Sequence, residues 1–157
     1  MKKLAAAIAV LATIGAAVSA LPAVAKNAPD AKYFLGKGDA KRSDVTFIVS
    51  DGKVRKALTN TGPVQCERGR SKLLKSFAAI PINGNEFKRD SEARQAPDRF
   101  VLAGRVYGGT ARGRMMTSAG GTSTGGCNSG VIRWEAERVS KKEWKKSRHG
   151  YQLSPPK

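Results

Sequence analysis

The sequence has only one histidine, His149, among its 157 residues. Nucleophilic catalysis by serine or cysteine needs a base held beside the nucleophile, and histidine is the usual base. His149 lies next to Gly150 in a polar stretch near the C-terminal end, where no apolar neighbour would orient its ring. We therefore expect no catalytic triad and interpret the protein as non-enzymatic.

Acidic residues are also scarce, with 12 Asp and Glu against 29 Lys and Arg. Glu135 and Glu137 share one face of an expected strand and are the best candidates for a glycosidase-type pair. Solvated carboxylates among basic cross-strand partners are the favoured interpretation. Two cysteines and one histidine make a poor metal site, and the glycines at 120–121 and 125–126 lack the Lys-Ser/Thr ending of a phosphate-binding loop. We expect no metal and no cofactor.

Long apolar runs are absent except at the N-terminus. Residues 1–25 begin with Met1-Lys2-Lys3, continue with an Ala-rich apolar run and end in Ala23-Val24-Ala25. This order is typical of a secretory signal peptide and predicts cleavage after Ala25. A retained membrane anchor is the alternative, which the weak hydrophobicity of the run disfavours. We expect a soluble mature chain without a transmembrane segment, secreted to the periplasm or the extracellular space.

The two cysteines, Cys66 and Cys127, are expected to form a disulfide, because an exported domain meets an oxidising environment. In the chain-entropy model, a bridge closing a loop of about 60 residues stabilises the folded state by roughly 4 kcal/mol.

Apolar residues recur with a period of two, which predicts β-strands. Val45, Phe47 and Val49 share one strand face, and Asp51-Gly52 predicts a hairpin turn before the alternation resumes over 54–59. Strands are also expected at 33–35, 99–107, 111–118 and 131–139, turns at 61–63, 83–84 and 108–109, an exposed connection at 90–98 and a mobile Gly/Ser/Thr-rich loop at 119–126. Residues 71–79 fit either a helical turn or a strand.

About seven to nine short strands with Gly-rich turns favour an all-β, mainly antiparallel fold, either a small β-sandwich or a closed β-barrel, with one disulfide. Phe100 and Trp134 are interpreted as core residues. The expected organisation is a signal peptide (1–25), a flexible N-terminal lead (26–32), a β domain (33–139) and a basic C-terminal tail (140–157) that is either a short helix or disordered.

Several segments together resemble a known group of proteins. The hairpin over 45–58, the run Phe77-Ala78-Ala79-Ile80-Pro81-Ile82 and the closing stretch from Cys127 to Ala136 occur in this order. The chain resembles a group of small exported bacterial β-domain proteins with paired cysteines and a Cys-x-Ser-Gly-x-x-x-Trp motif in the C-terminal strand. The resemblance covers about 33–139 and implies a paired-cysteine β domain. It implies no activity and no functional residues, and the basic tail lies outside it.

The positive charge is the feature that predicts a function. The net charge is +17, and removing the two lysines of residues 1–25 leaves +15. Charge of this size favours anionic partners. The candidate anion-binding residues are the tail residues Lys141, Lys142, Trp144, Lys145, Lys146 and Arg148, and the strand residues Arg105, Arg112, Arg114 and Arg133.

We expect an exported domain that binds an anionic cell-envelope polymer, lipid head groups or extracellular nucleic acid, with Trp144 stacking on a base or lying at a membrane interface. A solvated surface that only maintains solubility is the alternative for both groups of basic residues. A second functional hypothesis is a secreted small-molecule- or protein-binding module, similar to an inhibitor, that uses the loop at 119–126 and an apolar cavity.

Overall fold

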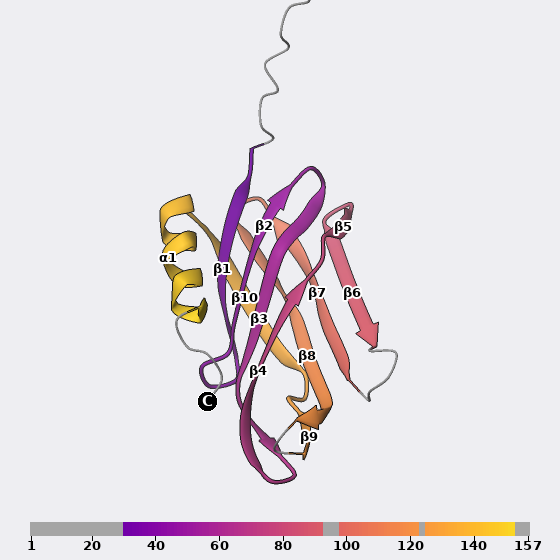
Figure 1. The fold of residues 1–157 in the computed structure, drawn as a ribbon. Coiled ribbons are helices and arrows are strands. Elements are labelled where there is room, and N and C mark those ends of the chain that lie inside the picture. Colours follow the sequence, from indigo (N-terminus) through magenta and orange to yellow (C-terminus); the bar gives the residue numbers. More distant parts are fainter. Residues whose placement is uncertain (1–29, 93–97, 123–124, 153–157) are drawn as a thin grey trace, which may run out of the picture.

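The computed structural model describes residues 30–92, 98–122 and 125–152, which form ten strands and one helix (Figure 1). The strands are β1 (Lys32–Gly38), β2 (Asp44–Ser50), β3 (Lys53–Cys66), β4 (Gly69–Phe77), β5 (Ile80–Asn83), β6 (Glu86–Glu92), β7 (Arg99–Tyr107), β8 (Thr110–Thr122), β9 (Gly125–Asn128) and β10 (Ile132–Val139). The helix, α1, spans Lys141–Gln152. The expected signal peptide and residues 26–29 of the lead lie outside the described residues.

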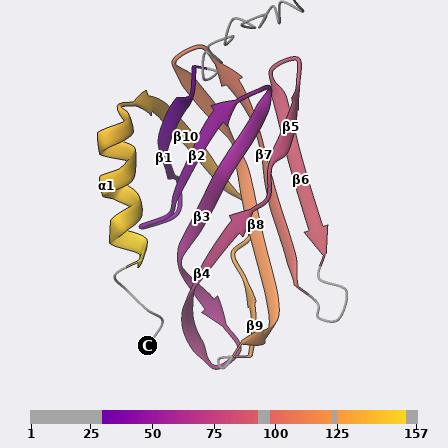
Figure 2. The same cartoon turned by 45° about the horizontal axis from the view of Figure 1, so that its top comes forward.

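All ten strands belong to one antiparallel sheet, which confirms the predicted all-β class. The pairings run from β1 through β2, β3, β5, β6, β7 and β8 to β10, and β10 pairs with β1 again. The sheet is therefore strongly curled and encloses its own core (Figures 1 and 2). In both views α1 lies beside β1, whereas β6 lies at the opposite side of the molecule.

The hairpin between β2 and β3 forms where the sequence predicts it. Asp51 and Gly52 both have positive φ angles, of 51° and 63°, and they connect the directly opposed residues Ser50 and Lys53. A two-residue turn with positive φ at both positions matches the right-handed twist of the flanking strands, and Asp-Gly tolerates it well. The predicted Asn83-Gly84 turn is also present, between β5 and β6.

The structure corrects two predicted connections. The expected turn at 61–63 is wrong, because β3 continues through it to Cys66; Gly62 adopts a φ of 69° there, and the register with β4 shifts between Asn60 and Pro63. This irregularity bends the strand without ending it. The expected mobile loop at 119–126 is also largely wrong, because β8 extends to Thr122 and β9 begins at Gly125. Within the polar connection expected at 90–98, residues 90–92 belong to β6, and 93–97 lie outside the described residues.

The main core is built around four aromatic rings. Phe47 contacts Phe34, Phe87 and Trp134, with ring centroids 4.9, 5.8 and 5.9 Å from its own. All four side chains are buried, which confirms the core position expected for Trp134. The sheet leaves room for the indole because Gly113 faces Trp134 across β8 and β10, and Gly104 faces Gly113 across β7 and β8.

A second, smaller cluster contains the disulfide. Cys66 on β3 and Cys127 on β9 are directly opposed and bonded, with their Cα atoms 4.2 Å apart. Val64, Leu73 and Ala119 surround the bridge. The predicted disulfide is therefore confirmed, and it connects the last residue of β3 to β9.

The C-terminal segment forms a docked helix. Ser140 caps α1: its Oγ accepts a hydrogen bond from the Glu143 amide at 3.2 Å, and the Glu143 carboxylate accepts one from the Ser140 amide at 2.9 Å. The Ser140 hydroxyl also donates a hydrogen bond to the Glu143 carboxylate at 2.7 Å, and this bond, followed by the one from the Ser140 amide, lowers the pKa of Glu143. Trp144 is 6% exposed and packs on Tyr33 of β1. No helix in the described part of the chain is long and apolar enough to span a bilayer.

Candidate anion-binding surface

Side chains alternate between the core and the outer face along β6, β7, β8 and β10. The register of these strands places the outward residues in rows that cross the sheet, since directly opposed Cβ atoms lie about 5 Å apart. Two adjacent rows carry most of the charge. The mixed row consists of Glu86, Arg105, Arg112 and Glu135. The cationic row consists of Lys88, Ala103, Arg114 and Arg133.

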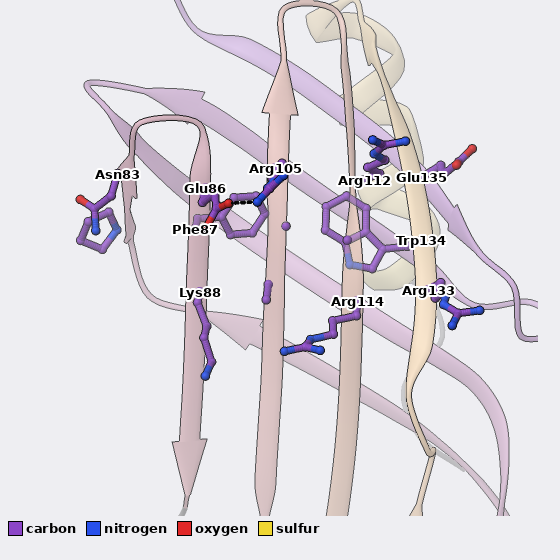
Figure 3. A pocket seen from close by; sticks show the side chains of 14 residues that line it. Asn83, Glu86, Phe87, Lys88, Arg105, Arg112, Arg114, Arg133, Trp134 and Glu135 are labelled. Atoms are coloured by element: carbon purple, nitrogen blue, oxygen red, sulfur yellow. Dashed lines mark ion pairs between the residues drawn. The ribbon is translucent and has the colours of Figure 1, made fainter.

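The mixed row neutralises itself. Glu86 forms an ion pair with Arg105, shown as a dashed line in Figure 3, and Glu135 is directly opposite Arg112. Tyr107 completes this group: the Arg112 guanidinium lies 5.2 Å from the centre of its ring and, together with Arg105, lowers the pKa of its phenol. Tyr107 and Glu86 in turn raise the pKa of Arg105. These two arginines are therefore engaged by their neighbours.

The four residues of the cationic row include no acid. Asp39 follows the row beyond β10, where its carboxylate accepts a hydrogen bond from the Arg133 amide at 3.1 Å. Among the described residues, no ion pair involves the side chains of Lys88, Arg114 or Arg133. Figure 3 shows Arg114 reaching from β8 toward β7, while Arg133 extends to the other side on β10. The row crosses three strand spacings, about 14 Å. It therefore presents three positive charges over a distance that suits one or two phosphate groups.

Small residues leave an open space above this part of the sheet. Ala103, Gly104 and Gly113 form the floor of a shallow hollow of about 890 Å³, and both the cationic and the mixed row line it (Figure 3). On the inner side, Trp134 lies against the two glycines, so a Cβ atom on either would be 2.6–2.7 Å from the indole. Core packing and the open outer surface thus depend on the same glycine pair.

The row on the other side of the cationic row begins with an ion pair. Arg99 binds Asp90 through two hydrogen bonds, of 3.0 and 2.7 Å, and these bonds lower the pKa of Asp90, with a smaller contribution from Lys88. Val101 and Met116 continue the row that begins with Asp90. Together with Val131 they line a smaller hollow of about 210 Å³, which Lys88 and Arg114 also line.

The basic helix forms a separate surface. Lys141, Lys142, Lys145 and Lys146 are exposed on α1. Arg148 donates a hydrogen bond to the Lys56 carbonyl at 3.4 Å and lies over the Trp144 ring. The buried Trp144 does not offer the free ring that stacking on a base requires, which corrects that expectation. Between α1 and β8 lies another hollow, of about 860 Å³, whose lining includes Glu135 and Glu137. Lys37 and Arg112 line the same hollow, so side chains of both signs lie between the helix and this part of the sheet.

The outer face offers little catalytic chemistry. No cluster of three His, Cys, Asp or Glu suited to a metal occurs within 30–92, 98–122 and 125–152. Residues 121–125 have the order Gly-x-Ser-x-Gly, which serine hydrolases place between a strand and a helix. Here the segment connects two paired strands, with Thr122 opposite Gly125, and Ser123 lies outside the described residues. The side chain of His149 also lies outside them.

Sequence reasoning found the arginines of this surface but missed Lys88 and Ala103. The period-two pattern places Arg112 and Arg114 on one face, as the structure does. Lys88 enters the surface only through the pairing of β6 with β7, which no local pattern specifies. Comparison of the chain with protein-family models, curated proteins and solved structures finds no match. The resemblance to small exported β-domain proteins therefore stays a prediction.

Proposed function

We propose that this protein is an exported, non-enzymatic β domain that binds an anionic ligand of the cell surface through the cationic row. The observation that carries the proposal is that no acid lies between Lys88, Arg114 and Arg133 along the row that they form across β6, β7, β8 and β10. Where basic residues serve only solubility, acids are usually interspersed, as they are in the adjacent mixed row. These three basic side chains also border an open hollow.

The rest of the molecule supports this role. The predicted signal peptide and the disulfide agree with export to an oxidising compartment. The net charge attracts anions over several ångströms beyond the surface. The four exposed lysines of α1 add to this attraction without forming the binding site, because they lie on a separate surface. The ligand would be held by the sheet and guided by the whole charge distribution.

The chemistry of the row favours phosphate or sulfate groups. Each guanidinium can donate two parallel hydrogen bonds to an oxyanion, and the Lys88 ammonium adds a point charge. Ala103 lies between Lys88 and Arg114, so an oxyanion can approach the sheet there without displacing a larger side chain. Binding of this kind weakens as salt concentration rises, because dissolved ions screen the charges.

Binding of dextran sulfate tests the proposal with two charge-matched triple variants. The row variant carries Lys88→Gln, Arg114→Gln and Arg133→Gln; the helix variant carries Lys141→Gln, Lys142→Gln and Lys145→Gln. All six side chains are exposed, so both variants should fold like the native protein. We expect the row variant to lose about tenfold or more in affinity at low salt, because it loses charge-assisted hydrogen bonds.

The helix variant should lose only about two- to threefold, because it removes long-range attraction alone. An equal loss of affinity in the two variants would mean that the protein binds through its overall positive charge. This result would contradict a specific binding site on the cationic row. A larger loss in the helix variant would move the site to α1.

A further inference from the structure

The cationic row has an apolar neighbour on the same outer face. Val101 is directly opposite Met116, and both lie one outward position along their strands from Ala103 and Arg114. Val131, the residue immediately before β10, lines the same hollow as these two side chains. These three side chains, here named the apolar row, line the hollow of about 210 Å³ that Lys88, Asp90, Arg99 and Arg114 also border. Val131 is exposed, Met116 is half-buried and Val101 is buried. Positive charge and apolar surface therefore meet along one line.

Val131 is exposed although the turn before it is held in place by hydrogen bonds. It is 62% exposed, the highest value among the large apolar side chains of the described residues. The turn before it is fixed: Ser129 donates its amide to the Thr117 carbonyl at 2.9 Å, and its Oγ accepts the Thr117 amide at 2.9 Å. The Gly130 amide donates to the Asn128 side chain at 2.8 Å.

The acid beside the apolar row is paired with an arginine. Asp90 continues this row on β6, opposite Val101, and Arg99 neutralises it through two hydrogen bonds. An uncharged part of a ligand that lies on Met116 and Val131 would therefore face no unpaired acid. An anionic part of the same ligand would reach Lys88 and Arg114 one row away.

We infer that the ligand is a phosphate-bearing lipid, with its phosphate on the cationic row and the first methylene groups of a chain on the apolar row. This inference rests on the proposed function, because it assigns the anion to the same site. A polyanion without apolar parts would satisfy the charges but would leave Val131 and the exposed part of Met116 in water. Each methylene group transferred onto an apolar surface contributes about a fourfold gain in affinity.

Three soluble probes separate the head group from the chain. Glycerol 3-phosphate carries the phosphate alone, dihexanoyl phosphatidic acid carries phosphate and chains, and dihexanoyl phosphatidylcholine carries chains on a head group without net charge. Calorimetric titration of the full domain below the micelle concentration measures each affinity. We expect phosphatidic acid to bind about tenfold or more tightly than either of the others, since the burial of only two methylene groups already contributes that much.

Substitution of the apolar row sharpens the test. Val131→Ser changes an exposed side chain and should not disturb folding. We expect it to reduce binding of phosphatidic acid toward that of glycerol 3-phosphate while leaving dextran sulfate binding unchanged. Ser118→Ala, on the outer face of β8 but outside both hollows, serves as the control and should change neither.

The outcomes separate the two proposals. If phosphatidic acid and glycerol 3-phosphate bind equally tightly and Val131→Ser has no effect, the lipid inference is wrong and the anion site stands. If the phosphate probes and dextran sulfate all fail to bind, the proposed function itself is wrong. If phosphatidylcholine binds as tightly as phosphatidic acid, the apolar row acts without the cations and the inference is also overturned.

Discussion

Replacing Gly113 by alanine is expected to destabilise the fold strongly without changing the charge of the outer face. A Cβ atom at this position would lie 2.0 Å from the Ala103 carbonyl oxygen, 2.6 Å from the Gly104 Cα and 2.6 Å from Cζ2 of Trp134. Two of these atoms belong to the backbone of β7. The third belongs to a ring that two phenylalanines hold in place.

The size of the effect follows from this crowding. Overpacking a well-filled core typically costs about 1–3 kcal/mol, and contacts on both sides of the strand place this substitution at the upper end, near 3 kcal/mol. For a domain of this size, that loss lowers the melting temperature by roughly 10 °C. Gly109→Ala is the control, because a Cβ atom there meets nothing within 4 Å.

Urea unfolding followed by tryptophan fluorescence measures the free energy of unfolding of both variants. We expect Gly109→Ala to remain within about 0.5 kcal/mol of the native protein. If Gly113→Ala does the same, Trp134 does not lie against this glycine. The register of β7, β8 and β10 would then be wrong, and the alignment of the cationic row would be lost with it.

Three further predictions concern the parts that surround the site. Replacing both Cys66 and Cys127 by serine should lower the free energy of unfolding by about 4 kcal/mol, because the bridge closes a loop with a sequence separation of 61; an unchanged denaturation midpoint would refute this. Trp144→Ala should cost about 3 kcal/mol because its ring is buried against β1, whereas Lys145→Ala should have almost no effect; equal midpoints for the two would mean that α1 does not dock. Burial raises the pKa of Asp44 to about 6, so the folded state holds the proton more tightly than the unfolded state and stability falls as pH rises from about 4 to about 6. Asp44→Asn should remove this fall and be the more stable protein at neutral pH; urea titrations over this range that run parallel for both proteins would count against it.

Local patterns predicted the parts of the fold that local chemistry decides. Asp51-Gly52 predicts its hairpin because two adjacent residues with positive φ suit few other sequences. The strands at 99–107 and 132–139 follow from alternation between one buried and one solvated face. The disulfide follows from the number of cysteines and the expected compartment.

Features that depend on distant partners were missed. The glycines at 125 and 126 predicted a loop, but in the structure they pack closely against Glu67. A Cβ atom at either position would lie within 3 Å of the Glu67 side chain. Four lysines dominate the composition of the C-terminal segment, which left a short helix and a disordered tail as alternatives and did not predict docking. Its single buried ring, Trp144, anchors it to β1. Polar composition describes the exposed face of a helix and not the face that docks.

The sequence predicted the candidate arginines of the site but not which of them belong to the cationic row. Four strand arginines were identified, yet two of them, Arg105 and Arg112, are engaged by Glu86 and Tyr107. Only the cross-strand register distinguishes these from Arg114 and Arg133, and the register depends on the whole curled sheet. Lys88 joins the row through that same register.

Amide chemical shifts during titration with inorganic pyrophosphate test the central claim most directly, because they locate the bound anion on the folded domain. The account predicts saturable shifts that are largest at Lys88, Ala103, Arg114 and Arg133 and small along α1. Shifts confined to the lysines of α1, or spread evenly over all basic residues, would contradict a binding site on the cationic row.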